Sequence, residues 1–154
     1  MLMDLVYIKN NLPHIELSYD FINHNKVYNL YVAIPYGKKY LLWFTFFNNE
    51  NICLLIEVNS KTKEIKSFEI ITVSYDHLLY GTILYGTIVF YNNVKYFLAE
   101  NVHYFNHINV EKKSFDNKII IFDKIFSKIN NNIYSIYQTV VGLCVMSNNH
   151  NSLL

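Results

Sequence analysis

The feature that most constrains the fold of this chain is a run of alternating residues on either side of two adjacent asparagines. Residues 84–90 alternate between two sets that would face opposite sides of a strand, and residues 95–103 form a second strand-like run. Asn92 and Asn93 lie between the runs, and asparagine tolerates the left-handed backbone angles of a two-residue turn. The pattern predicts an antiparallel β-hairpin, followed by a polar crossing over residues 105–110.

Further strands are expected on both sides of this hairpin. Alternation, or a high content of β-branched and aromatic residues, predicts strands over residues 15–21, 27–33, 40–47, 52–58 and 65–73. The first two of these are expected to pair as a hairpin around Asn23 to Asn25. A last strand is expected over residues 134–146, with a loose tail from Ser147 to Leu154.

One segment has the periodicity of an amphipathic helix. Its apolar residues recur at spacings of four and three, at Phe115, Ile119, Phe122, Phe126 and Ile129. Ser114 is suited to cap the amino end of this helix, and the asparagines that follow Ile129 are expected to end it. No strand–helix–strand repeat is visible. The sequence therefore predicts an α+β fold of antiparallel sheets with one main helix.

Composition limits the class of protein and the kinds of contact it can make. The chain has 154 residues, of which 52% are hydrophobic, so it can bury a core and is not a disordered chain. The net charge is only +1, and all 13 basic residues are lysines. Without arginine, contacts to phosphate must come from lysine, backbone N–H groups or a helix N-terminus. The abundance of Asn, Ile, Lys and Tyr is typical of AT-rich genomes, such as those of some large DNA viruses.

The cysteines and histidines have no spacing that indicates a reactive or metal-binding site. Cys53 and Cys144 are far apart in the sequence and are expected to be reduced, buried thiols. His103 and His107 are four residues apart but straddle the end of a predicted strand, so no metal site is expected. The N-terminus has no secretory signal pattern and no run reaches about 18 apolar residues, which predicts an intracellular, cytoplasmic protein that does not contact membranes.

The hairpin resembles the centre of the nucleotidyltransferase superfamily, which contains mRNA capping enzymes, nucleic-acid ligases and snurportin, a non-catalytic relative that binds an RNA cap. In the enzymes a strand with the pattern Leu-Asp-Gly-Glu is followed, after a turn, by a strand that ends near an Asp. Here Tyr85 replaces the first Asp and Thr87 replaces the Glu. Asn101 falls at the position of the second Asp, with Glu100 just before it. The hydrophobic residues of the two strands match the family pattern, whereas most of its acidic residues are replaced.

The loop over residues 34–39 falls where the family has its nucleophile motif, Lys-x-Asp-Gly-x-Arg. Gly37 matches the Gly and Lys39 the Arg, while Ile34 takes the place of the nucleophilic lysine and Tyr36 that of the Asp. Isoleucine has no amine for covalent nucleotidyl transfer, and one remaining Glu is too few to hold the metals of this chemistry. No catalytic residue, metal or cofactor is therefore expected. An ordinary surface turn before a core strand is the alternative interpretation of this loop.

The resemblance covers roughly residues 27–146 and implies the front half of the family's catalytic domain. The later motifs of the family and its C-terminal OB domain are not present in the sequence. The resemblance therefore implies one nucleotidyltransferase-like domain over residues 1–154, which is either a shortened relative of the family or a fragment of a longer protein.

The favoured function is that of a non-catalytic domain that binds a nucleotide or an mRNA 5′ cap. The resemblance implies an aromatic face from Trp43 for the base, Lys38 and Lys39 for phosphate, and Tyr85 or Thr87 near the ribose. A methylated guanine carries a positive charge, which an aromatic face attracts. The complete set of expected ligand-binding residues is Tyr36, Lys38, Lys39, Trp43, Tyr85, Thr87 and Glu100.

A structural or protein-interaction module is the alternative function. In that case Tyr36, Tyr85 and Trp43 fill the old pocket, and an outer surface contacts a protein partner in a viral RNA-processing, transcription or translation complex. Trp43 would then be an ordinary core residue, as a single Trp in a sheet usually is. An active nucleotidyltransferase is the third and least favoured function. Whether Tyr36 and Tyr85 point into the pocket distinguishes the first two.

Overall fold

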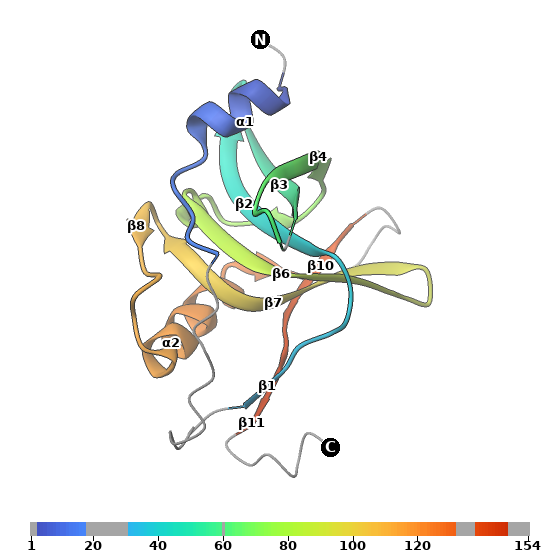
Figure 1. Cartoon of the computed structure of the whole chain (residues 1–154), viewed down its shortest axis with the longest axis vertical. Helices are drawn as coiled ribbons and strands as arrows, with labels where there is room; N and C mark the ends of the chain where they lie inside the picture. The colour runs from blue at the N-terminus through green and yellow to red at the C-terminus, as the bar shows by residue number, and fades with distance from the viewer. Residues whose placement is uncertain (1–2, 18–30, 60, 132–137, 148–154) are drawn as a thin grey trace.

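A curled sheet of seven strands forms the body of the molecule (Figure 1). The computed structural model describes residues 3–17, 31–59, 61–131 and 138–147. The order of the strands is β10–β7–β6–β2–β3–β4, and β8 extends the sheet beside β7. The strands of this sheet are β2 (Lys39–Phe47), β3 (Glu50–Val58), β4 (Ile65–Ile71), β6 (Thr82–Tyr91), β7 (Val94–Phe105), β8 (Ile108–Asn109) and β10 (Val140–Leu143).

Two short ribbons and two α-helices complete the described part of the chain. The ribbons pair β1 (Tyr31–Ala33) with β11 (Val145–Ser147), and β5 (Ser74–Tyr75) with β9 (Ile129–Asn130). The helices are α1 (Leu5–Asn11), α2 (Phe115–Phe126) and the short 3-10 helix η1 (His77–Leu79). The predicted α+β class is therefore confirmed.

The central hairpin has the predicted form. Asn92 and Asn93 have φ angles of 49° and 62°, which are the left-handed values of a two-residue turn between β6 and β7. Asn48 and Asn49 repeat this arrangement between β2 and β3, with φ angles of 49° and 61°. Both turns follow from the tolerance of asparagine for these angles.

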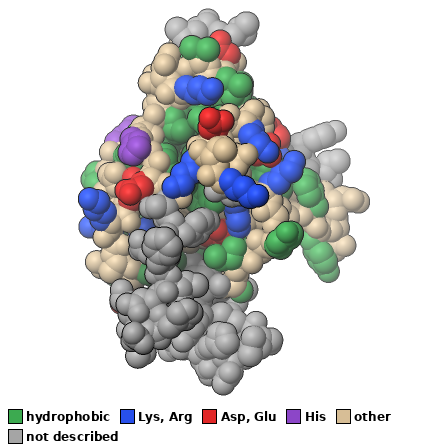
Figure 2. Space-filling model, in the orientation of Figure 1, with side chains coloured by type: hydrophobic (Ala, Val, Ile, Leu, Met, Phe, Trp, Pro, Cys, Tyr) green, Lys and Arg blue, Asp and Glu red, His purple; other side chains and the backbone are tan. Residues whose placement is uncertain are grey.

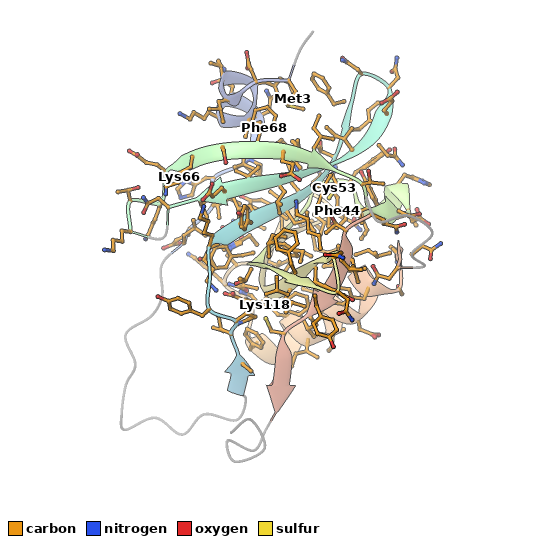
Figure 3. The ribbon with its side chains drawn as sticks, turned by 90° about the vertical axis from the view of Figure 1, so that its right-hand side faces the viewer. Met3, Phe44, Cys53, Lys66, Phe68 and Lys118 are labelled. Carbon is orange, nitrogen blue, oxygen red and sulfur yellow. The ribbon has the colours of Figure 1, made fainter. Side chains whose placement is uncertain are left out.

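The central strands of the sheet are buried on both faces, as the runs of consecutive buried residues in β2, β3 and β6 show, and this explains their nearly continuous apolar character. On the face covered by α2, Leu42, Phe44 and Cys53 pack with the helix. Figure 3 shows Phe44 and Cys53 beside each other on adjacent strands, where their backbones pair. On the opposite face Leu41 and Trp43 pack with α1. The two faces of β2 thus belong to two separate parts of the core, and both cysteines are buried free thiols, as expected.

Helix α1 was not expected from the sequence, which predicted only one main helix. The side chain of Asp4 caps it by accepting a hydrogen bond from the Tyr7 N–H group at 2.8 Å. Ile8 is completely buried against the sheet. A helix of seven residues is too short to show a repeating apolar pattern, and packing of its buried face stabilises it instead.

Helix α2 begins where predicted, because the Ser114 hydroxyl accepts from the Asn117 N–H group at 3.4 Å. It ends at Phe126, earlier than expected, because Ile129 belongs to β9. The predicted apolar stripe was partly wrong: Lys118, Phe122 and Ile125 are the buried positions of the helix, and Ile119 is only half-buried. Lys118 occupies an inward position because its ammonium donates a hydrogen bond to the Asn101 side chain on β7.

The C-terminal strand differs from the prediction in its direction and its length. β10 runs parallel to β7, with Val141 opposite Phe97, so β7, α2 and β10 form a strand–helix–strand crossover that was not expected. The predicted strand over residues 134–146 is represented by β10 and β11, while its first residues lie outside the described ranges. The predicted tail lies almost entirely outside them as well.

The described part of the chain contains no N-terminal hairpin of the predicted kind. Residues 15–17 form no strand, and residues 18–30 lie outside the described ranges. Side chains hold the first segment instead: the Glu16 N–H group donates to Glu111 Oε2 at 2.8 Å, and the Tyr104 hydroxyl donates to the His14 carbonyl at 2.9 Å. β1 pairs with β11.

Candidate functional site

Two β-bulges in β7 turn several polar side chains toward one face of the sheet. The pairing of β7 with β6 skips one residue at Glu100 and another at His103. Val102, between the bulges, remains in the core under α2. Glu100, Asn101 and His103 line one pocket. Bulges commonly redirect side chains in this way at binding sites.

The pocket has a volume of about 200 Å³ and is formed by segments that are distant in the sequence. Ile34 comes from the loop before β2, Tyr85 from β6, and Phe115 from the first turn of α2. The full lining consists of Glu16, Leu17, Ile34, Tyr85, Glu100, Asn101, His103 and Phe115. Carboxylate and aromatic groups thus face the same small space.

Glu100 is held by a half-buried cation and a buried hydroxyl. The Lys39 ammonium forms an ion pair with Glu100 Oε1 and donates to the Thr87 hydroxyl at 2.7 Å. Thr87 in turn donates to the same oxygen of Glu100 at 2.7 Å. Thr87 is completely buried, and the Glu100 side chain is 4% exposed. Within the described ranges both contacts fall on Oε1.

His103 is held in one tautomer by Glu111. Its Nδ1 atom lies 2.9 Å from Glu111 Oε2, and because a carboxylate can only accept, Nδ1 carries the proton. Burial lowers the pKa of His103, outweighing the opposing effect of the bond to Glu111, so the ring is neutral at neutral pH. Its other nitrogen, Nε2, is buried and has no hydrogen-bond partner among the described residues. The Tyr85 ring meets the imidazole edge to face, with 6.0 Å between centroids.

Asn101 adds an amide group to the same lining. Its Oδ1 atom accepts from the Lys118 ammonium at 2.8 Å and from the Val102 N–H group at 2.9 Å. The carbonyl end of the side chain is therefore engaged, and the amide end remains to donate. Burial lowers the pKa of Lys118, while the nearby charge of Glu111 acts in the opposite direction.

Four of the predicted ligand-binding residues lie at or directly behind this pocket. Tyr85 and Glu100 line it, and Lys39 and Thr87 support Glu100 from behind. The sequence suggested that Lys39 is a cation for phosphate. Its ammonium is instead bonded to Glu100 and Thr87. Thr87 is too deeply buried to contact a ribose.

The other three predicted residues lie elsewhere. Trp43 is 7% exposed and belongs to the core beside α1, so the interpretation as an ordinary core residue was right. Tyr36 is fully exposed and does not fill the pocket. The Lys38 side chain is 74% exposed and forms an ion pair with Glu57 at 3.6 Å.

A basic hollow adjoins the pocket across Lys39. It has a volume of about 330 Å³, and its lining includes the side chains of Lys38, Lys39, Lys61, Lys66 and Glu57. Lysine side chains gather across the middle of the face seen in Figure 2. Lys39 therefore connects the two spaces: its side chain lines the hollow and its ammonium contacts Glu100 of the pocket.

Four residues of the pocket were missed by the sequence analysis: Glu16, Leu17, His103 and Phe115. His103 was considered only as a metal ligand, and Phe115 only as part of the apolar stripe of α2. One signal was present in the sequence: Glu100 and Asn101 are adjacent polar residues in a strand that otherwise alternates. Such a pair indicates a bulge.

Searches for a metal centre, a membrane helix and relatives give no further guide to function. In the described ranges no three His, Cys, Asp or Glu side chains lie together so as to hold a metal ion. No helix in those ranges is long and apolar enough to cross a membrane. No protein-family model matches the sequence, and no curated protein matches it.

Proposed function

We propose that this chain is a non-catalytic nucleotide-binding domain whose favoured ligand is an mRNA 5′ cap. One observation carries the proposal. The resemblance places Ile34, Tyr85, Glu100 and Asn101 at or beside the nucleotide site, and these four residues, from three separate segments, line one pocket. The chemistry of the pocket lining and of the basic hollow also suits a nucleotide.

The pocket suits a flat, positively charged base. The aromatic residues Tyr85 and Phe115 and the carboxylate residues Glu16 and Glu100 belong to the same lining. A methylated guanine carries a positive charge, which both the aromatic rings and the carboxylates favour. These two rings take the role that the sequence analysis gave to Trp43.

The basic hollow suits the phosphates of the same ligand. Lys38, Lys61 and Lys66 contribute positive charge there, and Lys39 lies between the hollow and the base pocket. A nucleotide with its base against Glu100 would therefore extend its phosphates toward these lysines. Their contacts are those of point charges, because the chain has no arginine.

We expect that the protein forms no covalent nucleotide adduct. Ile34 occupies the pocket position at which the resembled enzymes have their lysine, and the nearby Lys39 is bonded to Glu100 and Thr87. Incubation with labelled GTP or ATP and Mg²⁺, followed by denaturing separation, should leave the protein unlabelled. A stable lysine phosphoramidate would contradict the proposal that the domain is non-catalytic.

A methylated cap dinucleotide should bind, and calorimetry measures its affinity directly. We expect a preference over the unmethylated dinucleotide of about 0.5–2 kcal/mol, from attraction between the cationic base and the aromatic rings. Affinity should fall as salt rises, because screening weakens the contacts between lysine and phosphate.

Variants separate the base pocket from the basic hollow. The double variant Lys38→Ala with Lys66→Ala should weaken binding of the cap dinucleotide about tenfold, while the methylated nucleoside alone binds as before. The double variant Lys112→Ala with Lys124→Ala removes the same charge from exposed positions that do not line the hollow, and should change little. Equal losses from both double variants would show that only the overall charge matters.

The tip of the central hairpin favours the second candidate function, a protein-interaction module. Phe90 and Tyr91 are 72% and 68% exposed, and this end of the hairpin extends beyond the rest of the sheet in Figure 1. Exposed aromatic residues are common at protein contacts. If the folded protein gives no heat with hundreds of micromolar cap dinucleotide, this second function is the one to pursue.

A further inference from the structure

We infer that residues 13–17 are a strap that opens to admit a ligand to the pocket and then closes against it. The inference rests on the proposed nucleotide-binding function, because it describes how that ligand enters. Two residues of the strap, Glu16 and Leu17, line the pocket. The other lining residues belong to β6, β7, the first turn of α2 and the loop before β2. Most of the pocket is therefore built on strands and a helix, and the strap is a wall of a different kind.

The strap lies against the core without belonging to a sheet. Ile15 and Leu17 are half-buried and pack on the core beside α1, whereas His14 and Glu16 are exposed. In the described part of the chain, residues 13–17 pair with no strand. A segment with half-buried apolar contacts and no strand pairing opens at a lower cost in free energy than the sheet does.

Glu111 and Tyr104 form the latch of this strap. Glu111 Oε2 accepts from the Glu16 N–H group at 2.8 Å, and the Tyr104 hydroxyl donates to the His14 carbonyl at 2.9 Å. Asn109 holds both latch groups from β8, because its amide donates to Glu111 Oε1 at 3.0 Å and to the Tyr104 hydroxyl at 3.4 Å. Both groups therefore keep a partner when the strap opens, and they stay in place to close it again.

The strap borders cavities in addition to the pocket. One cavity of about 210 Å³ is lined by Pro13, Ile15 and Leu17 among others, and another of about 560 Å³ is lined in part by His14 and Glu16. Dense packing opposes movement of a segment, and empty space beside the strap reduces that opposition. Water can replace the two latch bonds on opening, because His14 and Glu16 are exposed.

The closed pocket is small for the proposed ligand. Its volume is about 200 Å³, whereas sites for small molecules usually measure about 300–1,000 Å³. Movement of the strap enlarges the pocket, since Glu16 and Leu17 form part of its lining. A ligand favours a closed form only if it makes better contacts in that form. The Glu16 carboxylate supplies such a contact for a cationic base, so the ligand enters while the strap is open and then holds it closed.

Hydrogen exchange of the unaltered protein tests the motion of the strap. Without ligand, the Glu16 amide should exchange about tenfold or more faster than the amides of the hairpin of β6 and β7. Low concentrations of urea should not accelerate this exchange, because the strap opens without unfolding the sheet. Saturation with the methylated cap dinucleotide should slow it. Exchange of the Glu16 amide only together with the hairpin amides, or no change on binding, would overturn the inference and leave the proposed function in place.

The variant Tyr104→Phe weakens the latch without altering a residue of the pocket lining. Stopped-flow fluorescence with a labelled methylated cap dinucleotide measures its rates. Association and dissociation should both become about fivefold faster with little change in Kd, because loss of one hydrogen bond makes opening easier in the free and the bound protein alike. Tyr91→Phe removes a hydroxyl from an exposed residue of the hairpin tip, and this matched control should keep both rates.

The outcomes separate the strap from the proposed function. An unchanged association rate in folded Tyr104→Phe protein would overturn the inference, since a ligand that does not wait for the strap gains nothing from a weaker latch. If the unaltered protein did not bind the labelled dinucleotide, the proposed function would be overturned, and hydrogen exchange without ligand would decide whether the strap opens.

Discussion

Replacing Gly86 with alanine is expected to destabilise the fold by about 3 kcal/mol, at the upper end of the range for overpacked cores. A Cβ atom at this position would lie 2.1 Å from the Leu98 carbonyl oxygen and 2.9 Å from both the Leu98 carbonyl carbon and the Phe97 ring. The oxygen belongs to the backbone of β7, next to the bulge at Glu100. Relief of the clash therefore requires movement of the strand itself.

Urea denaturation of the two purified proteins measures this difference, and Gly142→Ala is the matched control. At Gly142 the nearest atom to an added Cβ would be Leu98 Cδ2 at 3.5 Å, an ordinary contact with a side chain. The control should change the free energy of unfolding by less than about 1 kcal/mol. Similar losses at the two glycines would show that the close approach of β6 and β7 is not the cause.

Phe122→Ala should lower the free energy of unfolding by about 3–5 kcal/mol, because it leaves a large cavity between α2 and the sheet. Phe122 is 1% exposed, and its ring stacks on Phe126 with 6.2 Å between centroids. The neighbouring Ile120 is 56% exposed, so Ile120→Ala should cost less than about 0.5 kcal/mol. A loss below about 1 kcal/mol for Phe122→Ala would mean that α2 packs with a different face.

Local signals account for the parts of the fold that could be predicted. The turn at Asn92 and Asn93, the strong apolar alternation of β2 and the cap at Ser114 are each encoded within a few residues. The parallel pairing of β10 with β7 joins segments about 40 residues apart in the chain, and nothing near Val141 specifies it. Lys118 illustrates the same limit, since its inward position depends on Asn101, a partner on another element.

Only part of the candidate site could be predicted, because the rest depends on how strands pair with each other. Tyr85 and Glu100 were placed by the resemblance, which fixes positions along the strands. Whether Lys39 is free or engaged depends on the register between β2 and β6, which brings it opposite Thr87. His103 entered the pocket through a bulge, and a bulge is a property of two paired strands. A single strand pattern does not contain that information.

The two bulges of β7 together determine which face of the sheet the side chains after them occupy. Phe97 and Ala99 face the α2 core before the first bulge, and Phe105 packs against the same core after the second. Each extra residue shifts the alternation by one, so the two together shift it by one complete period. The alternation of side chains between the two faces is therefore the same after Tyr104 as it is before Glu100. Loss of either extra residue alone would reverse the facing of one end of β7, whereas loss of both would remove the pocket wall and leave the remaining strand facing as it does now.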